Sequence, residues 1–120
     1  MKKLVFFILF MMAFTAISAA EPWSTQDKWL EVGDQLALAM DWRQTSEIHK
    51  LSGKHEMNSV LGLHPQQSSI NLYFLGAGLA HAEVANVLHG KWRTAWQCTW
   101  IAIEVGQVQR NYALGIRLNY

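Results

Sequence analysis

Apolar residues dominate the start of the chain and then give way to mixed, periodic patterns. After two lysines, residues 4–16 form an almost unbroken apolar run. Ser18 and Ala20 occupy positions −3 and −1 of a cleavage site before Glu21. A positive start, an apolar run and small residues before a cut are typical of a secretory signal peptide. We therefore expect a signal peptide over 1–20 that is removed on export, with a retained membrane anchor as the alternative.

The next stretch combines a helix start signal with a helical period. Ser24 and Asp27 have the spacing of a capping box. In this motif a hydroxyl and a carboxylate accept hydrogen bonds from the free backbone N–H groups at the start of a helix. Apolar residues then recur at steps of three and four as far as about Lys50, with acidic residues between them. The pattern predicts an amphipathic helix whose apolar face consists of Trp29, Val32, Gly33, Leu36, Ala37 and Met40.

A second helix is expected after a polar connection over 51–68. It should run over 70–88, with Ser68 or Ser69 as its N-cap. Gly90 is suited to the left-handed conformation that ends a helix. Several glycines and alanines in this helix leave little side-chain bulk, which favours the close approach of another helix.

A third helix is expected over 91–112. Trp92, Trp96 and Trp100 recur at steps of four and form an aromatic ridge, which we expect to fill the core against the small residues of the second helix. In a membrane protein the same tryptophans would anchor the helix at one interface.

From Tyr112 to Tyr120 apolar and polar or small residues alternate, which predicts an extended segment. The fold class is therefore all-α, with three principal helices in a small bundle behind the N-terminal signal helix and a short extended C-terminal tail. About 100 residues remain after the signal, enough for a single helical domain over 21–120.

Charge and cysteine usage narrow the classes of function. Without residues 1–20 the chain has eight Lys and Arg against nine Asp and Glu, so a nucleic-acid partner is not expected. Cys98 is the only cysteine, which excludes an intramolecular disulfide. Its apolar neighbours predict a buried, unreactive thiol.

Known catalytic and metal-binding motifs are missing. His55-Glu56 begins like the helical zinc-protease motif, but Ser59 stands where the second histidine is needed. The five histidines and Glu56 match no compact ligand spacing, so we expect neither a metal nor another cofactor. An enzyme would have to rely on His55, Glu56, His64 and His81 for acid-base chemistry.

Polar residues within the predicted helices and the connection form the most distinctive pattern of the chain. Buried polar groups must be paired, so we interpret them as a network that locks the connection onto the bundle, with a small polar cleft as the functional alternative. The candidate residues are Asp41, Thr45, His55, Glu56, Asn58, His64, His81, Glu104 and Asn111.

These motifs resemble a family of small uncharacterised bacterial and phage-borne envelope proteins. The family has an Asp-x-x-x-Thr helix, a His-Glu-x-Asn-Pro-x-Leu-Gly-x-His-Pro loop and a Trp-rich last helix. Here they correspond to Asp41 with Thr45, to residues 55–65 and to the helix that holds Trp92 and Trp96. The resemblance covers most of residues 23–120 but implies no activity, and Ser59 replaces the loop proline.

Together these features predict an exported protein of the periplasm or cell envelope with a non-enzymatic binding or structural role. Its expected partner is an envelope protein or a membrane surface. The alternative is a small integral membrane protein in which 70–88 and 91–112 form a hairpin with interior polar residues.

Overall fold

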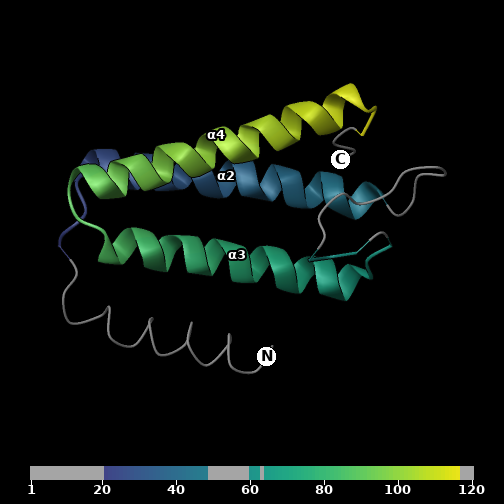
Figure 1. Ribbon diagram of the computed structural model, residues 1–120, viewed down its shortest axis with the longest axis horizontal. Coiled ribbons are helices and arrows are strands. Elements are labelled where there is room, and N and C mark those ends of the chain that lie inside the picture. The colour runs from purple at the N-terminus through teal and green to yellow at the C-terminus, as the bar shows by residue number, and fades with distance from the viewer. Residues whose placement is uncertain (1–20, 49–59, 63, 117–120) are drawn as a thin grey trace.

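A computed structural model describes residues 21–48, 60–62 and 64–116, and this part of the chain contains three α-helices and no strand (Figure 1). α2 spans Thr25–Ile48, α3 spans Gln67–Val87 and α4 spans Lys91–Ala113. The predicted all-α bundle of three principal helices is confirmed. None of the three combines the length and apolar composition that a membrane crossing needs. The predicted signal segment 1–20 lies outside the described residues.

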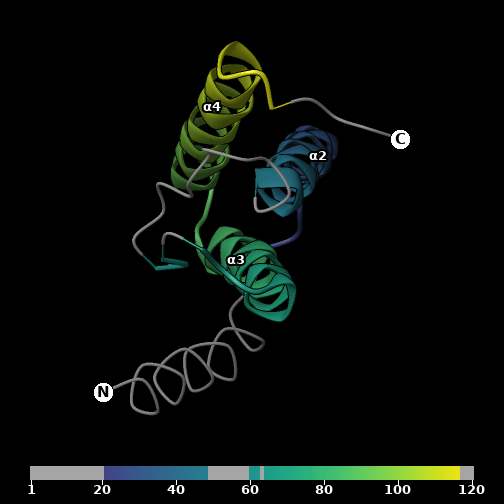
Figure 2. The ribbon, with the colours of Figure 1, turned by 90° about the vertical axis from the view of Figure 1, so that its right-hand side faces the viewer.

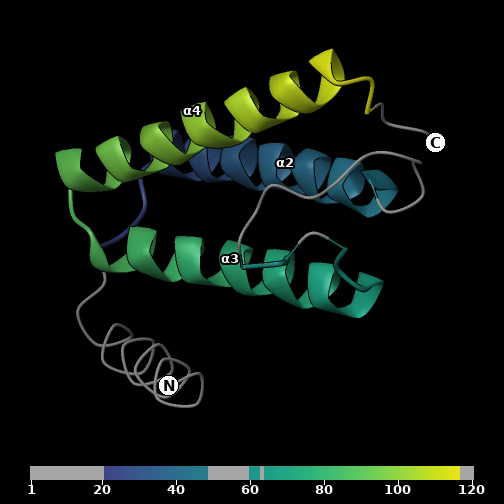
Figure 3. The same cartoon turned by 45° about the vertical axis from the view of Figure 1, so that its right-hand side comes forward.

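α2 and α4 run parallel, and α3 runs antiparallel to both (Figures 1 and 3). An ion pair between Asp27 and Arg93 joins the starts of α2 and α4, and a hydrogen bond from Asn111 to Asp41 joins them near their ends. Viewed along the helices, the three form a triangle (Figure 2). The two helices most closely associated are therefore not neighbours in the sequence.

The first helix begins where its cap was predicted. The backbone N–H of Ser24 donates to Asp27 Oδ2 at 2.8 Å, and the backbone N–H of Asp27 lies 3.1 Å from Ser24 Oγ, which accepts its hydrogen bond. This reciprocal pair satisfies two amides that have no helical acceptor. Ser24 is thus the N-cap of α2.

The predicted start of the second helix was wrong. α3 begins at Gln67, and no side chain caps it, because Ser68 and Ser69 lie inside its first turn. Gly90 does adopt a positive φ of 51°, but it directly precedes α4 instead of ending α3, which stops at Val87. A glycine serves this tight connection because it tolerates such a φ.

The predicted extended tail does not begin at Tyr112. Tyr112 and Ala113 belong to α4, and the chain then turns at Gly115, whose φ is 81°. The N–H of Ile116 donates to the carbonyl of Asn111 at 2.9 Å, which folds a buried side chain back onto the helix end. Residues 117–120 of the predicted tail lie outside the described residues.

Polar side chains fill much of the interior. Leu38, Ile70 and Phe74 form an apolar cluster between α2 and α3. The largest fully buried side chains, however, are mostly polar or charged, namely Arg93, Ile70, Gln44, Gln97 and Asp34.

The predicted apolar face of the first helix points the wrong way. Trp29, Val32, Leu36 and Met40 are exposed, and of that set only Ala37 is buried. Asp27, Asp34 and Leu38 share the same helical period and face α3 and α4 instead, where Arg93 pairs with Asp27 and His81 contacts one oxygen of Asp34.

Two further predictions, both about α4, were wrong in whole or in part. Cys98 is exposed, so the predicted burial of its thiol was wrong. It lies about 200° around the helix from Trp96 and Trp100, which are half-buried and face α3. Trp92 is 66% exposed, so only part of the predicted tryptophan ridge enters the core.

Candidate functional site

Arg93 closes one end of the polar interior. Its guanidinium is 1% exposed and donates to Asp27 Oδ2 at 3.1 Å, to the carbonyl of Ala85 at 2.7 Å and to that of Glu21 at 2.9 Å. The ring of Trp23 covers it at 5.2 Å. One side chain of α4 thereby fixes the segment before α2, the start of α2 and the end of α3.

The centre of the interior holds two carboxylates and an imidazole. Glu31 and Asp34 project from α2 toward His81 on α3, and Nδ1 of His81 lies 3.1 Å from Glu31 Oε1 and 3.1 Å from Asp34 Oδ2. Each of the three residues offers one ligand atom, and all three atoms lie within 4.8 Å of one another. We call this group the central cluster.

Aromatic rings hold the imidazole in place. His81 stacks on Trp96 with ring centroids 5.5 Å apart, and Trp100 meets it edge-on at 6.1 Å. The indole N–H of Trp96 also donates to the carbonyl of His81 at 3.2 Å. This cage fixes the ring plane of His81, whose Nε2 is buried without a hydrogen-bond partner.

Two amides orient Glu31. Gln35 donates to its Oε1 at 2.9 Å, and Gln97 on α4 donates to its Oε2 at 3.1 Å. Burial acts to raise the pKa of Glu31, but hydrogen bonds from His81, Gln35 and Gln97 outweigh it and hold the pKa below its usual value. The carboxylate is therefore kept ionised.

Asp34 has fewer partners. It is 2% exposed, and its Oδ1 has no hydrogen-bond partner. Burial raises its pKa, and the charge of Glu31 adds to that effect while His81 opposes it. At the end of the interior, burial likewise acts to raise the pKa of Asp27, but Ser24 and Arg93 lower it by more.

A second carboxyl pair lies farther along the same interface. Burial, together with the nearby charges of Asp41 and Asp34, raises the pKa of Glu104 to about 7. Asn111 donates to Asp41 Oδ1 at 3.0 Å and to Gln44 Oε1 at 3.0 Å. Glu104 Oε2 is buried without a partner.

The structure brings together part of the predicted set. Asp41, Glu104 and Asn111 meet between α2 and α4, while His81 belongs to the central cluster. Thr45 is buried on α2, and His64 is exposed before α3. The remaining predicted site residues lie outside the described residues, namely His55, Glu56 and Asn58.

Sequence reasoning missed Glu31, Asp34 and Gln97. Glu31 and Asp34 are three residues apart and so share one helical face, which was the available signal. The predicted inner face of this helix includes neither of them, because it follows the apolar residues. The partner on α3 is 47 residues from Asp34, and no local spacing indicates it.

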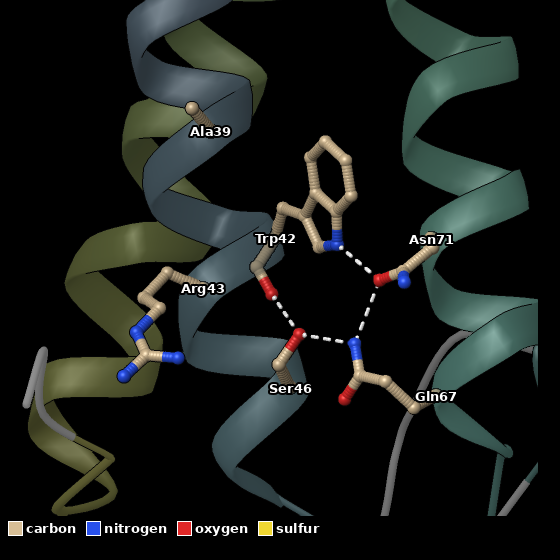
Figure 4. Close-up of a pocket in the computed structure, with 6 residues that line it drawn as sticks. All are labelled: Ala39, Trp42, Arg43, Ser46, Gln67 and Asn71. Atoms are coloured by element: carbon tan, nitrogen blue, oxygen red, sulfur yellow. Dashed lines mark hydrogen bonds between the residues drawn. The ribbon is translucent and has the colours of Figure 1, made fainter.

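A separate shallow pocket lies between α2 and α3 beside Ala39 and Arg43 (Figure 4). A chain of hydrogen bonds links its polar groups: Trp42 and Gln67 both donate to Asn71 Oδ1, at 3.0 and 2.7 Å, and Gln67 also donates to Ser46 Oγ at 3.0 Å. Because these groups bond to one another, we interpret them as a structural contact that holds α2 against α3.

No family model, curated protein or solved structure with which the chain was compared matches it.

Proposed function

We propose that this is an exported, non-enzymatic protein of the cell envelope that works by association with a membrane surface. The observation that carries the proposal is an apolar outer surface on α2 and α3. Between Lys28 and Arg43, every exposed residue of α2 is apolar, and from 70 to 82 every exposed residue of α3 is apolar or glycine. Its large members are Trp29, Val32, Leu36, Met40, Leu72, Leu75 and Leu79.

The two helices contribute to one continuous surface. Val32 and Leu36 line one hollow on the side of α2, and Leu75 and Leu79 line a neighbouring hollow between α2 and α3. Both hollows share Glu31 and Gln35 as lining residues. Exposed apolar patches of this kind mark interaction sites in proteins.

Lipid is favoured over a protein partner by the chemistry of the surface and of its borders. A protein interface carries a polar rim and a hydrogen bond for every 100–200 Å² or so, whereas every exposed residue over 29–42 of α2 is apolar. The half-buried Glu31 and Gln35 that line the hollows are already hydrogen-bonded, to His81 and to the carbonyl of Gly78. Lys28 and Arg43 stand at the two ends of this stretch, about 20 Å apart, with Trp29 beside one of them. Cations and tryptophan flanking apolar residues are typical of a protein lying at a membrane interface.

Cell fractionation tests the proposal. We expect the wild-type protein in the membrane fraction, released by alkaline carbonate, and a Leu36→Glu/Leu79→Glu variant shifted to the soluble fraction. Both side chains are exposed, so the fold should tolerate the change. The matched control is Ile103→Glu/Val105→Glu, which places the same two charges on exposed apolar positions of α4. The intact mass of the exported protein should show cleavage after Ala20.

Each other result has a definite meaning. Wild-type protein that only detergent releases would favour the integral hairpin, and wild-type protein in the soluble fraction would overturn membrane association. Equal loss of membrane binding in the α4 control would show that charge alone, rather than the α2–α3 surface, is responsible.

A further inference from the structure

We propose that the central cluster of Glu31, Asp34 and His81 is a binding site for a divalent transition-metal ion, held by one imidazole nitrogen and two carboxylate oxygens. His81 Nδ1 lies 3.1 Å from an oxygen of each carboxylate. Two ligands bound at about 2.1 Å to one ion are roughly 3.0 Å apart at a right angle and roughly 3.4 Å apart at a tetrahedral angle. The two imidazole–carboxylate separations fall between these values, and the three ligand atoms lie within 4.8 Å of one another, so small side-chain movements would bring all three onto one ion.

Carboxyl groups predominate around the cluster, which favours a bound cation. Glu31 and Asp34 face a single imidazole, and Asp41 and Glu104 add two more carboxyl groups nearby. The buried Arg93 does not neutralise these groups, because it forms an ion pair with Asp27 at the end of the bundle. Buried carboxylates are normally paired or coordinate a metal. Within the described part of the chain, the acidic groups at this interface outnumber the cationic ones.

Unsatisfied atoms point to a missing ligand independently of the charge. Asp34 is 98% buried, and although its Oδ2 contacts His81, its Oδ1 has no hydrogen-bond partner. Gln97 is fully buried and its Oε1 is also unpaired, on the same amide that donates to Glu31. An ion in the cluster, with a water bound to it, would give both oxygens a partner.

Neighbouring amides orient the ligands. Gln35 and Gln97 each donate to one oxygen of Glu31, at 2.9 and 3.1 Å, and Trp96 stacks on His81. Groups of this kind fix ligand orientation around metal ions, and their loss typically lowers metal affinity. Two of the three ligands, Glu31 and His81, are therefore held in place before an ion arrives.

An ion has a route to the cluster. Glu31 and Gln35 line the open hollow between α2 and α3, together with Gly78 and Leu79. Gln35 spans this hollow by donating to the carbonyl of Gly78 at 3.1 Å. Before this surface meets a membrane, rotation of the Gln35 side chain would open the path from solvent to the carboxylate of Glu31.

Calorimetric titration of the purified full chain, prepared with chelator and without a histidine tag, tests the site. We expect Zn²⁺ or Mn²⁺ to bind with a stoichiometry of one and to raise the melting temperature. Mg²⁺ should not compete, because an imidazole ligand selects against it. Asp34→Asn and His81→Gln should each weaken binding at least about tenfold. The matched controls, Glu83→Gln and His89→Gln, change exposed residues and should bind as the wild type does.

Circular dichroism must show that the variants keep their helices. If Asp34→Asn unfolds, the visible absorption of Co²⁺ added to the wild-type protein decides instead: an intense band supports the site, and the weak spectrum of hydrated Co²⁺ overturns it. The proposal is also overturned if neither Zn²⁺ nor Mn²⁺ saturates at one ion per chain. Unchanged binding by a folded Asp34→Asn variant would overturn it as well. In those cases His81 simply hydrogen-bonds to the two carboxylates.

Discussion

Arg93 shows how much of this fold depends on single buried side chains. It is almost inaccessible and holds three backbone carbonyls besides Asp27, namely those of Pro22, Glu21 and Ala85. An arginine suits this position because its planar group donates in several directions at once and stacks on an aromatic ring. Lysine could not make the same set of contacts.

We expect Arg93→Met to lower the free energy of unfolding by about 3–5 kcal/mol, because it leaves the carboxylate of Asp27 buried without its cation. Urea denaturation followed by circular dichroism measures the change. Arg110→Met removes an exposed arginine from the same helix and should change stability by less than about 0.5 kcal/mol. Similar losses in the two variants would show that the buried pair has no special role.

Glu104 makes stability depend on pH. Its carboxyl is protonated in folded and unfolded chains below about pH 4.5 and ionised in both above about pH 7. Between these limits the folded chain keeps a proton that the unfolded chain has lost, so the free energy of unfolding falls as pH rises. The fall is at most about 3 kcal/mol.

Glu104→Gln should remove that part of the pH dependence. With chelator present, we expect the variant to resemble the wild type near pH 4.5 and to be the more stable protein at pH 8, because it buries no charge. Melting temperatures across this range give the comparison, with exposed Glu83→Gln as control. A constant difference between variant and wild type at all pH values would contradict the assignment.

At the scale of helices, Gly78 of α3 lies where α2 packs closely against it. A Cβ at Gly78 would lie 2.8 Å from Gln35 Oε1 and 3.2 Å from Leu38 Cδ2, whereas a Cβ at Gly76 would meet nothing within 4 Å. The small-residue stripe of the sequence therefore contains one residue whose side chain would displace the Gln35 amide and press on Leu38, and another with open space around it.

Alanine at these two glycines should have opposite effects. Both changes gain helix propensity, but Gly78→Ala pushes Gln35 away from Glu31 and from its own carbonyl contact. We expect Gly78→Ala to be less stable than Gly76→Ala by about 1–3 kcal/mol in urea denaturation. Equal stabilities would mean that Gln35 relocates at no cost.

The helices could be predicted from sequence more reliably than their orientation. The capping box of Ser24 and Asp27 marks the true start of α2, because it depends on contacts between near neighbours. Which face of α2 is buried depends on α3 and α4, and polar residues such as Asp34 repeat with the same period as Leu36 and Met40. Helical periodicity identifies two faces but does not say which one faces inward.

The candidate site was predictable only in part for the same reason. His81, Glu104 and Asn111 are polar residues among apolar ones, and that contrast identified them, whereas Asp41 was identified by its spacing from Thr45. The partners of His81 were missed, because Glu31 and Asp34 lie on a helix whose other residues are also acidic and polar. Only the packing of three helices distinguishes the buried carboxylates from the exposed ones.

Over the described residues, and outside the cluster of Leu38, Ile70 and Phe74, the usual arrangement of charge and apolar surface is reversed. Asp34, Arg93 and Glu104 are buried, while Trp29, Leu72 and Leu79 are at least 65% exposed. Soluble domains bury large apolar residues and leave charged residues outside. The reversal is the reason that we assign the outer surface of α2 and α3 to lipid and the interior to an ion.

The parallel pairing of α2 with α4 also affects the order in which the chain folds. The contact between Asp27 and Arg93 joins residues 66 positions apart, so α4 must be available before the interface can close. Until then α2 and α3 can associate through Leu38 and Phe74 while the carboxylates of α2 stay hydrated. Docking of α4 is thus the step that removes water from them. Because it waits on distant contacts, we expect this protein to fold more slowly than bundles whose sequential helices pair.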